Sequence, residues 1–422
     1  MLRDVILLQK RELETRLAER YIPRQAQLQQ KDSSLIKVIM GPRRVGKSFL
    51  AIHQLSGSKK IGYVNFDDEK LVGLTDYNEL LAAVDSVYDH PKMLLLDEIQ
   101  NLPKWELLVN RLSRQGYNLF ITGSNAHLLS QELATHLTGR HTSIILFPFS
   151  FSEYLKVTHM ERTDSEKHQK LEEYLEQGGY PEPLTKNLNR KEYLSTLFDS
   201  VIYKDILRRY KIRNPQGIAD LSQYLLSNTA KEFSFTSLSK IGNCKSVHTV
   251  QRYLGYLQEA YLFFTLNKFS YKMRGQASEN KKIYCIDNGL ITAKAFQSSP
   301  DRGRRYENVV AVQLKYMESQ GNFKLYYWRN AQNEEVDFVI YKNRKVNQLI
   351  QVCSDMTKQK VRERENRALL KAAAELKCKN LLVLTADYEA VEKISWFGIK
   401  GKIKFVPLWK WLLKGEDLVK SA

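Results

Sequence analysis

Residues 41–48 read GPRRVGKS, which has the spacing G-x-x-x-x-G-K-S. This pattern requires a buried strand that turns directly into a helix, because its backbone N–H groups must converge on a phosphate at the helix N-terminus. The flanks meet that requirement: LIKVIM (35–40) is apolar like a buried strand, and SFLAIHQL (48–55) has helical spacing. The sequence therefore predicts an α/β fold built around a strand–loop–helix unit.

Each position of this loop has a mechanical task in binding a nucleoside triphosphate. Two glycines let the backbone curl, Lys47 reaches the β- and γ-phosphates, and Ser48 offers a hydroxyl to Mg²⁺. Arg43 and Arg44 either contact nucleotide or only solvate the loop. The predicted nucleotide-contacting set is Gly41, Pro42, Arg43, Arg44, Val45, Gly46, Lys47, Ser48 and Phe49.

A second motif, MLLLDE at residues 93–98, is an apolar strand that ends in two carboxylates. Its continuous apolar run is typical of a strand buried in a parallel sheet, and ligands bind at the carboxyl ends of such strands. Asp97 is therefore predicted to hold Mg²⁺ together with Ser48. Glu98 is predicted to polarise the attacking water; the alternative is a solvated carboxylate after a strand.

A third apolar strand, NLFI (118–121), leads into the polar residues Thr122 to Asn125. A polar side chain at the end of a central strand suits a sensor of the γ-phosphate, and we predict this role for Asn125, with Ser124 as the alternative. The competing interpretation is that these residues cap the following segment AHLLSQEL, since Ser and Asn are preferred helix caps.

These motifs resemble the AAA-type ATPases, and more narrowly a bacterial and archaeal family that joins such an ATPase to a C-terminal domain. Further marks of the resemblance are LTGR (137–140), LFPFSFSEYL (146–155), GGYP (178–181), VIYKDI (201–206), GRRYENVV and EEVDFVI. The resemblance implies ATP as the nucleotide. It also implies that Arg140 is an arginine finger, acting in a homo-oligomer such as a hexameric ring; from spacing alone it is equally a surface arginine.

At 422 residues the chain is long enough for two to four domains. No stretch approaches the roughly 18 apolar residues of a membrane span, so we expect a cytoplasmic protein without a membrane partner. Four widely spaced cysteines argue against a zinc site or a disulfide framework. The expected parts are an N-terminal helix (1–30), an AAA-type parallel-sheet core (31–155), a helical lid (156–215), a winged helix (216–275) and a restriction-endonuclease-like α/β domain (300–422).

The charge balance favours a polyanionic partner. The chain has 65 Lys and Arg against 47 Asp and Glu, a net charge of +18. Each Lys or Arg placed on a phosphate releases condensed counterions, so DNA is the predicted partner. The alternatives are a basic but inert surface, or attraction to acidic lipid or protein.

Residues 217–270 have the pattern of three helices followed by a strand pair with a basic tip, the order of a winged helix. The short second helix is expected to begin at a Thr236 or Ser237 cap. Winged helices also serve as dimerisation or lid modules. The candidate DNA-contacting residues are His248, Thr249, Gln251, Arg252, Lys272 and Arg274.

The C-terminal pattern of helix, strands, helix and strand resembles the PD-(D/E)xK nuclease fold, in which acidic residues and a lysine hold a metal ion. Glu307 and Asp337 match the first two acids, but Gln351 replaces the next acid and Cys353 stands at the lysine position. We therefore expect a degenerate site that does not cut DNA. Glu307 and Asp337 are still able to retain a metal in this interpretation, with Lys342 or Lys345 as a substitute base.

Two functions follow from these patterns. The first is a DNA-directed ATPase motor or remodeller that acts on duplex or branched DNA in repair, recombination or defence. The second is a nucleotide-dependent switch with a protein partner or a role in transcriptional regulation. The basic charge, the winged helix and the nuclease-like domain favour the first.

Overall fold

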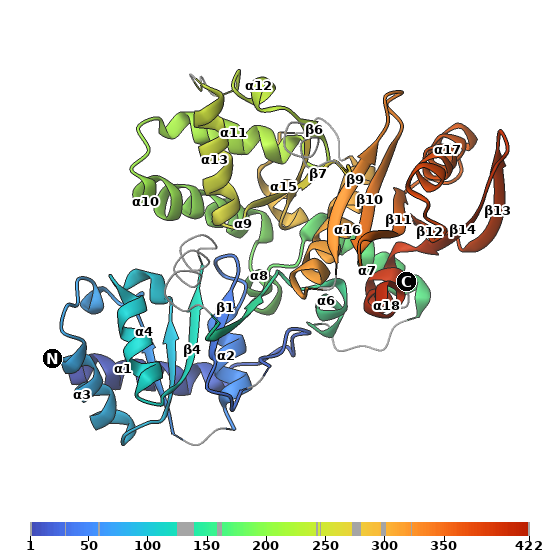
Figure 1. The fold of residues 1–422 in the computed structure, drawn as a ribbon. Helices are drawn as coiled ribbons and strands as arrows, with labels where there is room; N and C mark the ends of the chain where they lie inside the picture. Colours follow the sequence, from blue (N-terminus) through green and yellow to red (C-terminus); the bar gives the residue numbers. More distant parts are fainter. Residues whose placement is uncertain are drawn as a thin grey trace. The chain divides into compact units, whose positions relative to one another are not determined.

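The computed structural model describes residues 2–29, 31–57, 60–124, 139–157, 163–241, 244, 246–271, 280–296, 301–321 and 323–420 (Figure 1). The chain divides into two compact units. The first comprises Met1–Phe147 with Glu259–Tyr261, and the second Pro148–Gln258 with Leu262–Ala422. Every helix in the described part of the chain is too short or too polar to cross a membrane.

The first unit contains a five-stranded, wholly parallel sheet with the strand order β2-β3-β4-β1-β5. Its buried strands are apolar without alternation, as expected of a sheet with helices on its faces. The parallel α/β core predicted from the sequence is confirmed. Its elements are α1 (Leu2–Ala18), β1 (Ile36–Met40), α2 (Lys47–Leu55), β2 (Ile61–Asn65), η1 (Glu69–Leu71), α3 (Tyr77–Tyr88), β3 (Met93–Asp97), η2 (Ile99–Asn101), α4 (Trp105–Arg114), β4 (Asn118–Gly123) and β5 (His141–Ile145).

The N-terminal helix is shorter than expected. It ends at Ala18 instead of continuing to residue 30, and residues 20–29 have no regular secondary structure apart from a bend. Pro23 disfavours the helical conformation of the residue before it, so a helix cannot easily run through this segment. The segment after the helix packs beside α2, where Tyr21 stacks on His53 with a centroid separation of 4.5 Å.

The second unit begins with a group of helices that includes the GGYP segment (178–181). Gly178 ends α7, and a Cβ added there would lie 1.9 Å from Oδ1 of Asp287. The N–H of Gly179 donates to the same carboxylate at 2.7 Å. GGYP is thus a site of close packing between the end of α7 and the start of α8. The helices are α6 (Phe151–Val157), α7 (Asp164–Gln177), α8 (Pro181–Thr185), α9 (Arg190–Ser200), the π-helix η3 (Val201–Leu207) and α10 (Arg208–Tyr210).

The next elements form a helical group with a three-stranded antiparallel sheet of order β6-β8-β7. The short helix begins after a Ser234 cap, two residues before the expected position. Strand β8 lies beyond residue 275, where the predicted winged helix ends. The elements are α11 (Pro215–Ser227), β6 (Glu232–Phe233), α12 (Phe235–Leu238), α13 (Val247–Glu259), β7 (Phe263–Asn267), β8 (Lys281–Cys285) and α15 (Asn288–Lys294).

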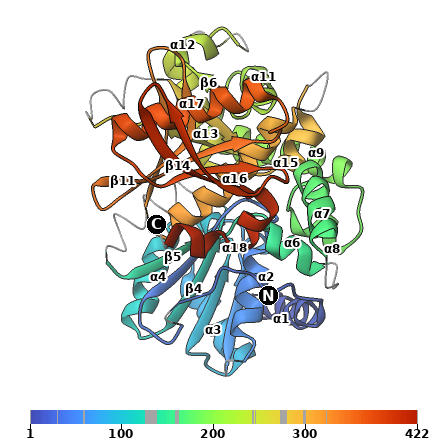
Figure 2. The same ribbon diagram turned by 90° about the vertical axis from the view of Figure 1, so that its right-hand side faces the viewer.

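The C-terminal part is a six-stranded mixed sheet between two layers of helices. Its strand order is β13-β14-β12-β11-β10-β9. Helix α17 packs on one face, and α16 and α18 pack on the other (Figure 2). The elements are α16 (Arg302–Ser319), β9 (Lys324–Arg329), β10 (Glu335–Lys342), β11 (Lys345–Cys353), α17 (Gln359–Leu376), β12 (Leu381–Thr385), β13 (Ala390–Trp396), β14 (Ile399–Pro407) and α18 (Leu408–Lys420).

Candidate functional site

The phosphate loop connects β1 to α2 and depends on glycine at both ends. Gly41 has φ 147°, and a Cβ there would lie 2.2 Å from the carbonyl oxygen of Leu146. Gly46 has φ 88° in the left-handed region and stands at the N-cap of α2. Both conformations favour glycine, so the loop has the backbone that its sequence predicts.

Lys47 lies folded into this loop. Its ammonium donates to the carbonyl oxygen of Pro42 at 3.0 Å and lies 3.5 Å from Oε1 of Glu98. Only 4% of the residue is exposed. A buried ammonium that contacts only a carbonyl and one carboxylate keeps its charge available for a further anion at the N-terminus of α2.

Asp97 is almost completely buried. Its Oδ1 accepts from Ser48 at 2.8 Å and also from Thr122, and its Oδ2 accepts from the Tyr63 hydroxyl at 3.0 Å. Burial raises the pKa of Asp97 above its ordinary value, and the Glu98 charge adds to this rise, while the hydroxyl donors oppose it. The predicted pair of Ser48 and Asp97 is thus in direct contact.

Glu98 follows in a left-handed conformation with φ 51°. Its N–H donates to the Thr122 hydroxyl at 3.0 Å, and its Oε2 accepts from Gln100 at 2.6 Å and from Ser124 at 3.1 Å. Burial acts to raise the pKa of Glu98, but Lys47, Gln100 and Arg43 hold it below its ordinary value. A non-glycine residue in this conformation is uncommon and often marks a functional site.

Several residues of the site escaped sequence reasoning. Tyr63 and Gln100 contact the two carboxylates directly, and Gln100 belongs to the same LLLDEIQ run that carries them. Arg24 is buried and donates to the carbonyl oxygens of Val45, at 2.8 Å, and Phe147. The sequence signal near Arg24 is Pro23, which disfavours a helix through this segment.

The structure places Arg140, one of the two remaining predicted residues, away from the phosphate loop. Asn125 lies outside the described residues. Arg140 is exposed and precedes β5, where its carbonyl oxygen accepts from the N–H of Ile36. This is the amino edge of the parallel sheet, whereas the loop follows the carboxyl end of β1. Five residues of strand, about 16 Å, separate the two edges, so Arg140 cannot reach the loop of its own subunit.

The other predicted sites lie in the second unit. His248, Gln251 and Arg252 are exposed on α13 and Thr249 is half-buried, while Lys272 and Arg274 lie outside the described residues. The thiol of Cys353 is buried, and burial raises its pKa to about 11. Lys342 and Lys345 pair with each other at the far end of the β10–β11 hairpin, so neither approaches Asp337.

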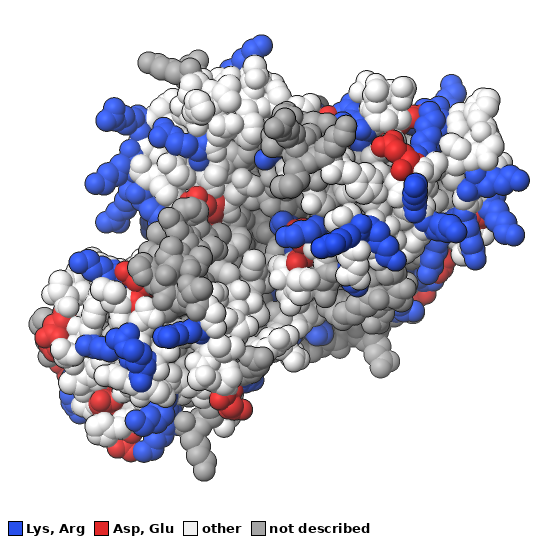
Figure 3. Space-filling view, in the orientation of Figure 1, with Lys and Arg blue, Asp and Glu red and all other residues white. Residues whose placement is uncertain are grey.

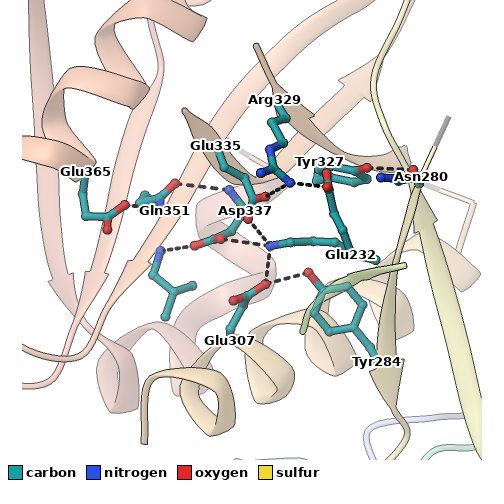
Figure 4. A network of polar contacts seen from close by, with 12 residues as sticks. Glu232, Asn280, Tyr284, Glu307, Tyr327, Arg329, Glu335, Asp337, Gln351 and Glu365 are labelled. Carbon is teal, nitrogen blue, oxygen red and sulfur yellow. Dashed lines mark hydrogen bonds and ion pairs between the residues drawn. The ribbon is translucent and has the colours of Figure 1, made fainter. Parts of the chain in front are cut away.

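The carboxylates of Glu307 and Asp337, predicted from the nuclease resemblance, lie around a lysine together with Glu335 (Figure 4). The ammonium of Lys282, on β8, lies 2.7 Å from Glu307, 2.6 Å from Glu335 and 3.3 Å from Asp337. Tyr284 also donates to Glu307 at 2.7 Å. Sequence reasoning missed Lys282 because nothing local to KKIYC marks one lysine of the pair as buried.

The side chain of Gln351 forms hydrogen bonds with other residues of the cluster. Its side-chain oxygen accepts from the N–H of Asp337 at 3.2 Å, and its amide donates to Glu365 at 2.6 Å. Among the described residues, no group of three or more His, Cys, Asp or Glu side chains is arranged to hold a metal ion. The cation that contacts these carboxylates is the ammonium of Lys282.

The charges of this cluster act on one another. Burial raises the pKa of Asp337 well above its ordinary value, and the Glu307 charge adds to the rise. Although burial acts to lower the pKa of Lys282, Glu307 and the other acids hold it well above its ordinary value. The ammonium stays charged and stabilises the acids around it.

Comparison with known families gives three successive matches. Residues 33–155 match an AAA domain. Residues 168–301 and 302–411 match a Domain of unknown function (DUF8612) and a Domain of unknown function (DUF4143). The AAA domain predicted from the sequence is confirmed, and such a domain implies nucleotide binding.

Two relatives extend the similarity along most of the chain. An uncharacterized protein of Methanocaldococcus jannaschii is 37% identical over 399 residues, which cover 90% of this chain and 88% of the relative. The chain belongs to the family of this protein. A second member, an uncharacterized protein of Haemophilus influenzae, is 31% identical over 322 residues, covering 71% of this chain and 80% of the relative.

Solved structures are less similar to this chain than these two relatives are. The Walker-type ATPase of Pyrococcus abyssi is 15% identical with a TM-score of 0.41, and the match covers 61% of this chain and 90% of that one. A similarity at this level carries no argument about the site.

The buried lysine generates a stability prediction. We expect Lys282→Met to lower the free energy of unfolding by about 3–5 kcal/mol, because it leaves buried carboxylates without their cation. Lys281→Met, one residue away on the half-buried side, should cost less than about 1 kcal/mol. Chemical denaturation of both variants checks this, and equal losses would contradict the role of Lys282.

The same variant should respond to pH. Without the ammonium, the buried acids have folded-state pKa values above their unfolded values, so the folded state binds more protons. The stability of Lys282→Met should therefore fall as pH rises from about 5 to 8, more steeply than that of the unmodified protein. Parallel pH profiles for the two proteins would contradict this account.

Proposed function

We propose that the protein is a cytoplasmic, homo-oligomeric, Mg²⁺-dependent ATPase of the AAA type that acts on DNA. The observation that carries the ATPase assignment is the position of Glu98, 3.5 Å from the phosphate-loop Lys47 and adjacent to the Ser48–Asp97 pair. A low-pKa carboxylate beside the expected γ-phosphate position is suited to polarising water.

The residues present fit MgATP. Ser48 and Asp97 would hold Mg²⁺, which supplies positive charge to the phosphate oxygens. Lys47 would exchange its contact with the Pro42 carbonyl for the β- and γ-phosphates. Ser124 and Gln100 would hold the Glu98 carboxylate in line with the attacking water. Asn125, as the sequence predicts, would sense the γ-phosphate.

The position of Arg140 supports an oligomer. It is exposed, and it lies at the sheet edge away from its own phosphate loop. An arginine finger placed there would complete the site of a neighbouring copy, where its guanidinium offsets charge on the transferring phosphoryl group. A ring is the closed arrangement in which each copy serves the next.

The helical group of the second unit supports contact with DNA. Helices α11, α12 and α13 with the antiparallel sheet agree with the winged-helix interpretation, and α13 exposes His248, Gln251 and Arg252. Tyr210 stacks on Tyr256 at 3.8 Å and so brings α10 against α13. Lys and Arg side chains gather over α10 (Figure 3), where Arg208, Lys211 and Arg213 are exposed.

The C-terminal part supports a nuclease-like fold without cleavage. The order α16-β9-β10-β11-α17-β12 agrees with the predicted fold. Lys282 contacts the acids that would otherwise hold a metal ion, and Gln351 is engaged with Glu365. We infer that this domain binds its partner and leaves the DNA strands intact.

Two substitutions test the ATPase site. Lys47→Ala should abolish nucleotide binding, because it removes the cation at the phosphates. Glu98→Gln should still bind ATP but hydrolyse it at least about 100-fold more slowly, since the amide cannot accept a proton from water. A fluorescent nucleotide titration and a phosphate-release assay measure the two effects. Equal turnover by Glu98→Gln and the unmodified protein would exclude the role given to Glu98.

DNA dependence tests the partner. At about 100 mM salt, where phosphate contacts are still only partly screened, we expect ATP turnover to rise severalfold with duplex, single-stranded or four-way-junction DNA. The DNA should be recovered without nicks after incubation with Mg²⁺ or Mn²⁺. Turnover indifferent to all three forms would favour the nucleotide-dependent switch with a protein partner instead.

Mixing inactive variants tests Arg140. Arg140→Ala retains its phosphate loop, and Lys47→Ala retains its arginine, so a mixed oligomer should recover part of the ATPase rate when the finger acts between copies. Co-purification through a tag on one variant establishes that mixed oligomers form. Mixed oligomers that remain inactive at every ratio would rule out a finger acting between copies.

A further inference from the structure

The β13–β14 hairpin carries a row of lysines on one face. Lys400, Lys402 and Lys404 alternate along β14, and Lys393 on β13 lies directly opposite Lys402. All four are exposed, and none forms an ion pair with a described residue. Lys and Arg side chains gather over this part of the second unit (Figure 3). We call Lys393, Lys400, Lys402 and Lys404 the lysine face.

No carboxylate lies on this face of the two strands. The register puts only Val391, Lys393 and Ser395 of β13 beside the lysines of β14. The carboxylate of the hairpin, Glu392, points to the other face, where it accepts from Arg362 at 2.5 Å beneath α17. The charge of the lysine face is therefore uncompensated by its own sheet.

Protection of a sheet edge does not account for these lysines. Edge strands often carry lysine to prevent pairing with other chains. Of the two strands of the hairpin, only β13 lies at an edge of the sheet, and it carries one of the four lysines. The other three lie on β14, which pairs with β12 on one side and with β13 on the other, so it has no free edge to protect.

The arrangement also opposes folding of the free protein. Like charges directly opposite each other in an antiparallel pair are destabilising, and Lys393 and Lys402 are such a pair. Successive lysines on one face of a strand stand about 6.6 Å apart. A regular row of cations without acids has the chemistry to bind a regular row of anions.

We propose that the lysine face binds the phosphate backbone of a nucleic acid. Each lysine would contact a phosphate and release counterions. At the turn, Phe397 is 91% exposed beside Gly398 and packs on Trp396 at 5.1 Å, a position from which its ring can stack on a base. This inference rests on the proposed action on DNA and names a second contact surface, on different elements from α13.

A nucleic acid fits this face better than an anionic membrane. Phe397 and Val391 are its exposed apolar side chains among the described residues of the hairpin, and they lie at opposite ends of the lysine row. Stable membrane attachment needs apolar area gathered in one place together with the basic charge. A row of single charges along two strands instead matches a polyanion with evenly spaced phosphates.

The test compares three fourfold variants. The first replaces Lys393, Lys400, Lys402 and Lys404 with Gln, and the second replaces them with Arg. The control carries the same loss of charge at four exposed lysines elsewhere, namely Lys70→Gln, Lys104→Gln, Lys191→Gln and Lys379→Gln. Fluorescence anisotropy with labelled duplex and single-stranded DNA, measured over a salt series, gives Kd and its salt dependence.

We expect the Gln variant to bind DNA at least tenfold more weakly at 100 mM salt, and the slope of log Kd against log salt to fall by up to about 3.6, at about 0.9 per lost phosphate contact. The Arg variant and the control should stay within about threefold of the unmodified protein. Without DNA, the Tm of the Gln variant should equal or exceed that of the unmodified protein, because the repulsion is removed.

The outcomes separate this inference from the proposed function. If the unmodified protein binds DNA and the Gln variant matches the control, the lysine face is not a contact surface, although action on DNA stands. If the unmodified protein binds no DNA, both proposals fail. Sedimentation with vesicles containing about 30% phosphatidylserine, lost in the Gln variant while DNA binding is unchanged, would assign the face to lipid and overturn the inference.

Discussion

The nucleotide site depends on one buried carboxylate. Asp97 accepts hydrogen bonds from Ser48 on α2, Thr122 on β4 and Tyr63 on β2, so donors from three elements converge on a single acceptor. An unpaired carboxylate could not remain at 2% exposure, because the cost of its desolvation would be uncompensated. Thr122 also accepts from the N–H of Glu98, and this bond fixes the left-handed residue that places the second carboxylate beside Lys47.

The second unit also brings carboxylates together, and there a lysine side chain is their cation. Its three acids, Glu307, Glu335 and Asp337, converge on one point where Asp337 is buried and the other two are partly buried, so they need a positive partner to remain charged. Lys282 supplies that charge from β8, a strand of another sheet. In the proposed function the first unit would take its cation, Mg²⁺, from solution, whereas in the second unit Lys282 supplies the cation. This difference supports the proposal that the second unit does not cleave DNA.

The predictability of the two sites follows the sequence distance over which their contacts form. The phosphate loop and β3 could be predicted because each position has a local backbone or ligand task. Lys282 meets its partners 25 to 55 residues later, and Arg24 meets Phe147 across 123 positions, so no local pattern marks either one. The helix end at Ala18 was missed because polar helical spacing continues past it, while Pro23 and long-range contacts determine the path.

The two proposed tasks lie in different compact units. Nucleotide hydrolysis belongs to the first, whereas α13 and the lysine face belong to the second. The chain passes between the units at 147–148, 258–259 and 261–262. The last two crossings lie at the C-terminal end of α13, since its last residue, Glu259, belongs to the first unit with residues 260–261, while β7 begins at Phe263. In the proposed function, strain on α13 from bound DNA would pass along the chain to the ATPase unit, a physical route by which DNA would alter the rate of hydrolysis.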